Sequence, residues 1–225
     1  LLNNAKDPAK ASTVSVTLDV DAENWTVMIH DDGVGIFEKL ANFLKTDRFQ
    51  EVMLELSKGK LTTDPQNHTG EGIFFSSRTL DQFKIEANGY CYLRDNVDDD
   101  WTFFQEAPLK GTKLTLKHAL QTEKSLVAVF KRYQTGDSLD FDRTDMHVAL
   151  IKHGNRLISR SQAKRVLNNL DRFKHIMLDF KDVRAVGQGF ADEIFRVFKN
   201  KHPKKAITSI NVNEAVQFMI DRVVI

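Results

Sequence analysis

The chain has 225 residues, 41% of them hydrophobic, and its 32 basic and 31 acidic side chains leave a formal net charge of +1. This length suits one large or two modest domains, and the near-neutral charge gives no general attraction for nucleic acid. The single cysteine, Cys91, excludes an internal disulfide and fits a reducing cytoplasm. No stretch approaches the roughly 20 apolar residues of a membrane span, so we expect no membrane partner.

The first half alternates between helical and strand patterns in an order that predicts a layered α/β sandwich. Residues 1–10 place four apolar side chains on one helical face. Paired strands follow, then two amphipathic helices, the second capped by Asp47, and a polar, glycine-containing segment at 57–71. One more helix and four strands complete this half. These strands and helices are expected at residues 12–20, 25–31, 36–45, 47–56, 73–80, 83–87, 90–94, 101–106 and 112–117.

The second half has a different rhythm. A helix at 126–133 leads to the turn-forming residues 134–138, and strands then alternate with helices, which is typical of an α/β unit with a largely parallel sheet. Ser159 and Asn213 stand where helix N-caps are expected. We therefore divide the chain into a domain at 1–120, a connecting helix and linker at 121–137, and a domain at 138–225. The strands and helices of the last domain are expected at residues 148–152, 159–170, 176–180, 190–199, 206–212 and 213–223.

The most informative motif is Asp31-Asp32-Gly33-Val34-Gly35-Ile36, which directly follows an expected strand. A carboxylate at a strand end can accept a hydrogen bond from an exocyclic amine. The glycines let the chain turn with φ > 0 and let the backbone approach a ligand closely. Alone, the motif is also typical of a strand-to-loop turn with a solvated aspartate.

Three further segments add to this motif. Asn4 and Asp7 lie three apart in the opening helix, and an asparagine oxygen is a suitable ligand for Mg²⁺. Residues 67–78 carry two glycines into a helical pattern, where free backbone N–H groups can meet phosphate oxygens. Gly111 then opens a strand, and the hydroxyl of Thr112 can reach a phosphate. The four segments together are much more specific than any one of them.

In this order, the four segments resemble the ATP-binding (Bergerat) domain of histidine kinases, gyrase-type topoisomerases, Hsp90 chaperones, MutL proteins and anti-sigma serine kinases. The resemblance covers residues 1–120 and implies ATP and Mg²⁺ as cofactors. It implies that Asn4 binds the magnesium, that Asp31 reads adenine, and that Asp7 reaches the adenine region through water. The implied nucleotide-binding residues are Asn4, Asp7, Asp31, Gly33, Gly35, Ile36, Thr69, Gly70, Glu71, Gly72, Ile73 and Thr112.

One departure from the family concerns catalysis. The family's catalytic glutamate stands four residues before the asparagine, and that place falls just before Leu1. We therefore expect the chain to begin inside a helix and to lack this glutamate. The resemblance assigns no catalytic residue within the chain and implies ATP binding without settling turnover.

The second half resembles the STAS domain of anti-sigma-factor antagonists, and more closely a STAS-like family of undetermined activity. The residues that carry this resemblance are 178–183 and 186–192. In true antagonists a serine at the start of the helix accepts phosphate, whereas Gly187 and Gln188 occupy the matching positions and cannot be phosphorylated. The turn at 187–189 is open to two interpretations, an anion cradle or a tight turn packed on the sheet. Ser159 is expected to be a plain N-cap.

These features predict a cytoplasmic, bacterial regulatory protein in which Mg-ATP binding and lid closure control the fused STAS-like domain or a partner. Two alternatives stay open. One is an active serine/threonine kinase or slow ATPase that uses a glutamate just before Leu1. The other is a nucleotide-independent part of a transcription regulator, with contact to DNA only through a segment before Leu1. A regulatory protein partner is expected, and a homodimer is left open.

Overall fold

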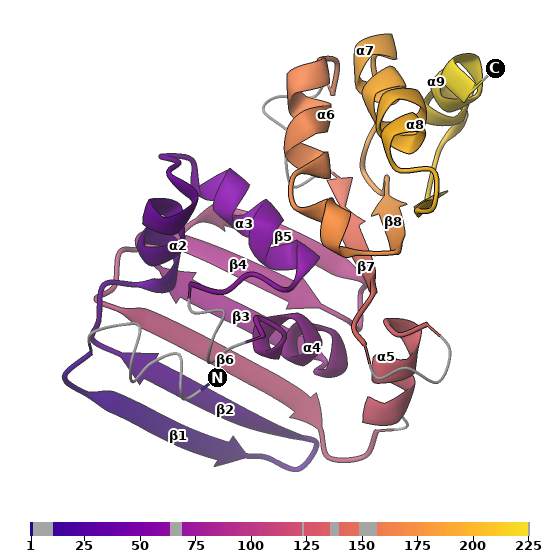
Figure 1. Ribbon diagram of the computed structural model, residues 1–225. Helices are drawn as coiled ribbons and strands as arrows, with labels where there is room; N and C mark the ends of the chain where they lie inside the picture. The colour runs from indigo at the N-terminus through magenta and orange to yellow at the C-terminus, as the bar shows by residue number, and fades with distance from the viewer. Residues whose placement is uncertain (2–10, 64–68, 123, 136–139, 149–156, 225) are drawn as a thin grey trace. The chain divides into compact units, whose positions relative to one another are not determined.

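The chain forms two compact units, Leu1–Phe130 and Lys131–Ile225 (Figure 1). The computed structural model describes residues 1, 11–63, 69–122, 124–135, 140–148 and 157–224. Both units mix helices and strands. The first contains a six-stranded antiparallel sheet, and the second contains a three-stranded parallel sheet.

The sheet of the first unit has the strand order β1-β2-β6-β3-β4-β5, so two strands far apart in sequence, β2 and β6, lie side by side. In β6, buried and partly exposed residues alternate at its start, as expected for a strand in a sheet that has one covered face. The central strands carry the most buried residues, and β1 at one edge is exposed along its whole length. The strands are β1 Val14–Val20, β2 Asn24–Asp31, β3 Gln82–Ala87, β4 Tyr90–Asp95, β5 Asp100–Gln105 and β6 Thr112–Ala119.

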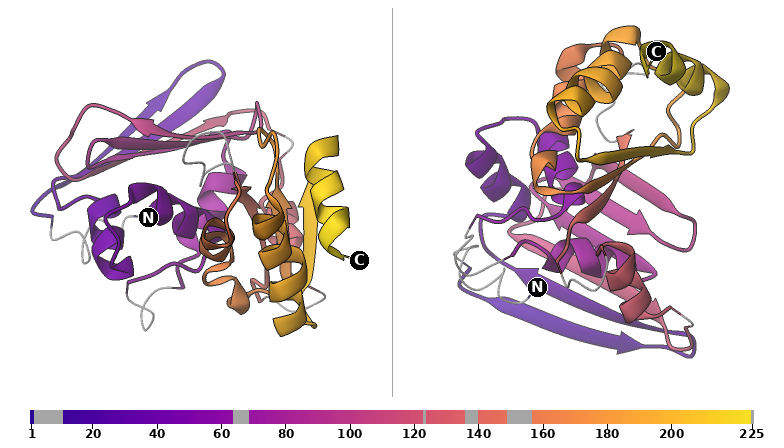
Figure 2. Two further views of the ribbon diagram at one scale, coloured as in Figure 1. Left: turned by 90° about the horizontal axis from the view of Figure 1, so that it is seen from above. Right: turned by 45° about the vertical axis from the view of Figure 1, so that its right-hand side comes forward.

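Helices cover one face of this sheet and make it a two-layer arrangement (Figures 1 and 2). The covering helices are α2 Ile36–Leu44, α3 Phe49–Lys58 and α4 Gly72–Thr79, and α5 Leu126–Arg132 follows β6. Their apolar side chains meet those of the strands in a core rich in phenylalanine. Fully buried members of this core include Phe37, Val52, Met53, Phe74, Phe83 and Ile85.

The start of α3 differs from the sequence prediction. Asp47 does not cap this helix; its N-cap is Arg48, which makes no side-chain capping bond. The hydroxyl of Thr46 accepts the Arg48 N–H at 3.2 Å and donates to Glu51 Oε2 at 2.9 Å. Thr46 therefore fixes the entry to the helix in place of the predicted cap.

The second unit is built on three parallel strands in the order β7-β8-β9, as the alternation of strands and helices predicted. Its core comes from apolar residues of these strands, of the helices and of the turns that connect them, including Phe173, Leu178, Phe180, Phe190 and Ile194. The helix from Gln188 to Lys201 is continuous but includes a π-helical run in its middle. The elements are β7 Arg143–His147, α6 Arg160–Leu167, η2 Leu170–Arg172, β8 His175–Asp179, α7 Gln188–Ala191, η3 Asp192–Phe198, α8 Lys199–Lys201, β9 Ala206–Ile210 and α9 Glu214–Val224.

The strand β7 at Arg143–His147 was not predicted from the sequence. The predicted strand at 148–152 falls almost wholly on residues 149–156, which lie outside the described part of the chain; Val148, its one described residue, is not in a strand. Parallel pairing with β8 decides the position, because it places Thr144 beside Ile176 and Met146 beside Leu178, all of them buried. This long-range pairing is not visible in the local pattern.

Candidate functional site

Asp31 ends β2 and is held by the backbone around it. Only 5% of the surface of Asp31 is exposed to solvent. Its Oδ1 accepts the N–H groups of Gly33 at 2.9 Å and Thr112 at 3.3 Å. Within the described part of the chain, no hydrogen bond ends on the other oxygen, Oδ2. Asp31 is therefore a fixed, largely buried carboxylate whose second oxygen can accept a donor from a ligand.

Gly111 brings β6 against Asp31. Its φ of +76° is in the left-handed region, and a Cβ at this position would lie 1.9 Å from the Asp31 carbonyl oxygen. Only glycine can occupy this place, because both the backbone angle and the missing space exclude a side chain. The glycine turn was expected from the sequence, but Gly111 was not among the predicted site residues.

The glycines of the motif have different roles. Gly35 has the expected positive φ, +84°, and is the N-cap of α2. Gly33 does not belong to the residues with positive φ, so the expectation was wrong for this position. Its contribution is the N–H bond to Asp31, which closes the turn after the strand.

Asn88, in the turn between β3 and β4, secures the same motif from a distance. Its Nδ2 donates to the Val34 carbonyl at 2.9 Å, and its Oδ1 accepts the Glu38 N–H at 3.1 Å. A Cβ on Gly35 would lie 2.3 Å from this Oδ1, which explains why the motif needs a glycine there. The Asn-Gly pair in the sequence is a hairpin signal, but nothing local indicates this long-range contact.

Thr112 and Ile36 join the start of β6 to the start of α2. Thr112 Oγ1 accepts the Ile36 N–H at 2.9 Å, while the Thr112 N–H donates to Asp31. The hydroxyl thus satisfies one of the free N–H groups at the helix start. The structure therefore brings together Asp31, Gly33, Gly35, Ile36 and Thr112 from two segments of the predicted site, and we call these five residues the Asp31 cluster.

Asp32 is engaged differently from its neighbour. It accepts hydrogen bonds from the Ser12 hydroxyl at 2.5 Å and from the N–H groups of Ser12 and Thr13, and it pairs with Lys110 at 3.4 Å. The Ser12 hydroxyl and the Thr13 N–H are the main reasons that the pKa of Asp32 lies well below its usual value, and desolvation opposes them only in part. This carboxylate ties β2 to the segment that precedes β1.

The predicted phosphate lid lies around the start of α4. Thr69 is exposed, Gly70 has a φ of +72° and packs on the Leu61 backbone, and Glu71 is the N-cap of the helix. A Cβ on Gly72 would meet nothing within 4 Å, whereas Ile73 is buried. Among the described residues, no hydrogen bond joins Thr69–Ile73 to the Asp31 cluster.

The predicted metal ligand cannot be placed. Asn4 and Asp7 lie outside the described residues. In the part of the chain that is described, no three His, Cys, Asp or Glu side chains are grouped so that they could hold a metal ion. The magnesium site therefore stays a prediction from sequence.

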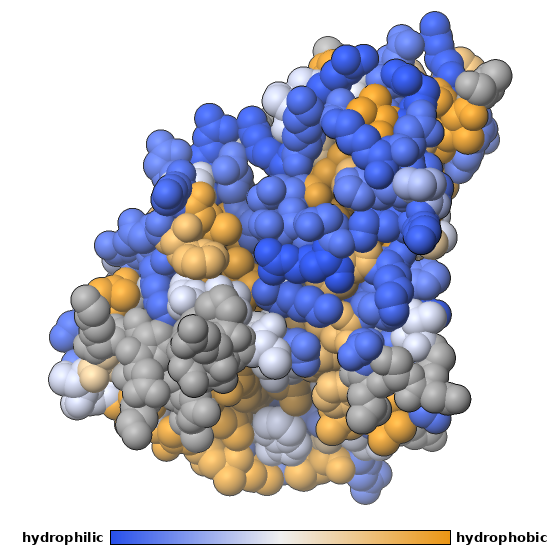
Figure 3. Space-filling view, in the orientation of Figure 1, coloured by the Kyte–Doolittle hydropathy of each residue, from blue (hydrophilic) through white to orange (hydrophobic). Residues whose placement is uncertain are grey.

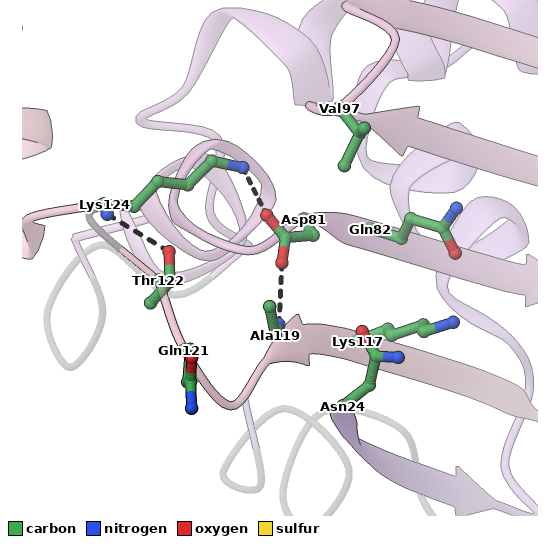
Figure 4. Close-up of a pocket in the computed structure, with 9 residues that line it drawn as sticks. All are labelled: Asn24, Asp81, Gln82, Val97, Lys117, Ala119, Gln121, Thr122 and Lys124. Atoms are coloured by element: carbon green, nitrogen blue, oxygen red, sulfur yellow. Dashed lines mark hydrogen bonds and ion pairs between the residues drawn. The ribbon is translucent and has the colours of Figure 1, made fainter. Parts of the chain in front are cut away.

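An open pocket of about 600 Å³ lies at the opposite end of the sheet, where β2 begins and β6 ends (Figure 4). Asp81 is the only acid among the described residues that line it; it accepts the Ala119 N–H at 2.7 Å, pairs with Lys124 at 2.5 Å and lies 3.0 Å from His118. Burial would raise the pKa of Asp81, but these partners outweigh burial and lower it. Groups of the protein itself therefore engage both carboxylate oxygens of Asp81. The pocket is lined by Asn24, Asp81, Gln82, Val97, Lys117, Ala119, Gln121, Thr122 and Lys124, none of which belongs to the predicted site.

In the second unit, Gly187 begins the long helix where an antagonist has its serine. Its N–H donates to the Leu157 carbonyl at 2.8 Å, and a Cβ here would lie 2.9 Å from Ile158. Close packing of two loops therefore explains this glycine and favours the tight turn over the anion cradle. Ser159 is the expected N-cap, because its hydroxyl accepts the Gln162 N–H.

Part of this second unit matches a known protein family. Residues 162–217 match the model of a family described as "STAS-like domain of unknown function (DUF4325)". The chain contains a STAS-like domain. The matched residues of the STAS-like domain run from α6 through β8, the long helix and β9 into α9. The family description names no activity for the STAS-like domain.

Two further findings concern the whole chain. No curated protein matches it in sequence. In the described residues, no helix has both the length and the apolar character that crossing a membrane requires.

Proposed function

We propose that this chain is a cytoplasmic Mg-ATP-binding regulatory protein, in which nucleotide bound by the first unit controls the STAS-like domain. The observation that carries the proposal is the state of Asp31. One carboxylate oxygen accepts two backbone N–H groups, and the other has no hydrogen bond within the described part of the chain.

The chemistry of this carboxylate suits adenine. The exocyclic amine of adenine is a hydrogen-bond donor, and Asp31 Oδ2 is an acceptor that the surrounding backbone holds in place. Guanine carries a carbonyl oxygen at the same ring position, and two acceptors facing each other repel. The proposal therefore includes a preference for ATP over GTP.

The phosphates would meet the second glycine segment. Gly72 opens α4, and the empty space around it permits close approach of a ligand to the helix start. Backbone N–H groups at such a start favour negative charge. Asn4 is the proposed magnesium ligand, and closure of residues 69–73 over the phosphates is the proposed signal to the STAS-like domain.

The test is calorimetric titration of Mg-ATP into the full chain and into Asp31→Asn. The substitution turns an acceptor into an amide that can present a donor to the adenine amine, so we expect affinity to fall about ten- to a hundredfold, as for loss of a hydrogen bond to a charged group. Far-ultraviolet circular dichroism would verify that the variant is folded.

Asp32→Asn is the matched control, because it removes the same charge from the neighbouring residue. Asp32 is engaged by Ser12 and Thr13, and we expect this variant to bind Mg-ATP nearly as well as the wild type. Equal affinities for wild type and Asp31→Asn, or wild-type protein that binds no ATP, would contradict the proposal.

A further inference from the structure

The edge strand β1 has an unusual surface. All seven residues from Val14 to Val20 are exposed, and four of them are large and apolar. Val14, Val16, Leu18 and Val20 are 42%, 56%, 65% and 55% exposed and alternate along the strand, so they share one face. Figure 3 shows hydrophobic surface along the lower border of the molecule, the region where β1 and β2 lie in Figure 1.

The same four residues direct their backbone groups away from the sheet. The Asp32 N–H donates to Thr13 and the Asp21 N–H donates to Asn24, and these bonds mark hydrogen-bonded pairs at the two ends of the β1–β2 ladder. Since such pairs alternate in an antiparallel ladder, residues 13, 15, 17, 19 and 21 bond to β2. The N–H and C=O groups of the even-numbered residues 14–20 therefore point to the open edge.

Nothing in the strand protects this edge. Natural edge strands usually carry a lysine, a proline or a bulge that prevents pairing with another chain. β1 has none of these, and its single charged residue is Asp19. Within the described part of the chain, no other strand pairs with the outer side of β1.

The sequence of β1 is chemically symmetric about Thr17. If a second β1 ran antiparallel with Thr17 opposite Thr17, Val14 would face Val20 and Val16 would face Leu18, all through outward backbone groups. On the other face, Asp19 would lie opposite Ser15, so no like charges would meet. Cross-strand pairs of these kinds stabilise an antiparallel ladder: two apolar side chains, two threonines, or an aspartate opposite a serine that can donate a hydrogen bond to it.

We propose that β1 pairs with β1 of a second copy of this chain, across a two-fold axis at Thr17, and joins the two sheets. In an isologous interface residue i contacts residue j of the partner and j contacts i, so every pair occurs twice. The near-palindromic sequence of β1 makes each of these repeated pairs compatible, which favours a second copy of β1 as the partner strand. Val14 is the cross-strand neighbour of Asp31, but the inference uses only the exposure, backbone direction and sequence of β1 and does not depend on nucleotide binding.

Cysteine cross-linking of the full chain tests the register. Residue 17 would face itself in a non-hydrogen-bonded pair, with Cα atoms about 4.5 Å apart, which is within the range of a disulfide. We expect Thr17→Cys to form a covalent dimer on mild oxidation. Ser15→Cys alone should not, but a mixture of Ser15→Cys and Asp19→Cys should form the mixed dimer. The native Cys91 is buried and would not interfere.

Analytical ultracentrifugation tests the energetics. Leu18→Pro removes an outward N–H without removing a bond to β2, and we expect it to weaken dimerisation at least about tenfold, as blocked edge pairing should. Gln105→Pro is the matched control on the other edge, since its N–H also points outward from β5. A wild-type chain that stays monomeric at high micromolar concentration overturns the proposal. A wild-type dimer whose Thr17→Cys variant does not form the disulfide also overturns the proposal. This second outcome decides the matter even if Leu18→Pro fails to fold.

Discussion

At the scale of single residues, two adjacent carboxylates illustrate how differently the fold can treat the same side chain. Asp31 is nearly buried, with one oxygen bound to backbone N–H groups, whereas Asp32 pairs with Ser12, Thr13 and Lys110. The Asp-x-Gly-x-Gly pattern was enough to select Asp31, because the strand before it and the glycines after it fix its position. The pattern does not indicate that Asp32 anchors the chain before β1, since this bond reaches back twenty residues.

Cys91 gives a prediction at the same scale. The thiol is fully buried in β4, and burial raises its pKa to about 11; Lys84 opposes this rise, while Glu86 and Glu106 add to it. Because the thiolate is the reactive form, we expect almost no labelling of the native protein by a thiol reagent at pH 8 and rapid labelling in urea. The measurement is the absorbance of released chromophore with time.

The exposed thiol of Lys164→Cys provides the reference rate for that experiment. Residue 164 is exposed on α6, so its cysteine should react at once under native conditions. If Cys91 reacted as fast as this reference, the described burial of β4 would be wrong.

At the scale of elements, the helix α6 offers a clean test of local capping. The Ser159 hydroxyl accepts the Gln162 N–H at 3.2 Å, and Gln162 Oε1 accepts the Ser159 N–H at 2.9 Å, which together form a capping box. We expect Ser159→Ala to lower the free energy of unfolding by about 1 kcal/mol, the usual value of an N-cap. Urea denaturation followed by circular dichroism would measure it.

Ser161→Ala is the control for this prediction. Ser161 is equally exposed, and its hydroxyl lies 2.9 Å from that of Ser159 but is not the cap. Alanine favours the helix interior, so the change should be neutral or slightly stabilising. Equal losses for both serines would show that the cap contributes nothing particular.

The elements also show what local patterns can and cannot determine. Most strands and helices were predicted to within a few residues, because alternation and helical periodicity report directly on a buried face. Asn213 caps α9 as predicted, through the Val216 N–H. The strand β7 was not predicted, because its position depends on parallel pairing with β8. The π-helical run at Asp192–Phe198 was also missed, since nothing in the sequence pattern distinguishes it from a regular helix.

At the scale of the whole molecule, the proposed regulation requires nucleotide in one unit to affect the other. Hydrogen exchange of the full chain with and without Mg-ATP would measure this coupling. We expect slower exchange of the Asp31 cluster and a change of exchange in the STAS-like domain as well, because a ligand that binds one state better shifts the population of both parts. Asp31→Asn should lose both effects together.

An effect confined to the first unit would contradict regulation of the STAS-like domain while leaving nucleotide binding in place. The two parts of the proposal can therefore fail separately. Calorimetry decides the binding, and exchange decides the coupling.

The candidate site itself was only partly predictable from sequence. Asp31, Gly35 and Thr112 were selected by their motifs, and the fold brings them together. Gly111 and Asn88 were not assigned, because their roles depend on atoms that become neighbours only in the folded sheet.

The position of β6 between β2 and β3 has a consequence for folding during synthesis on the ribosome. Thr112 is 81 residues downstream of the aspartate whose carboxylate it completes. At ordinary rates of translation, several seconds pass between the synthesis of these two residues. During that time the nascent chain has the acidic strand without its neighbour, so the arrangement around Asp31 that is proposed to bind adenine forms late, in one step, when β6 emerges and inserts.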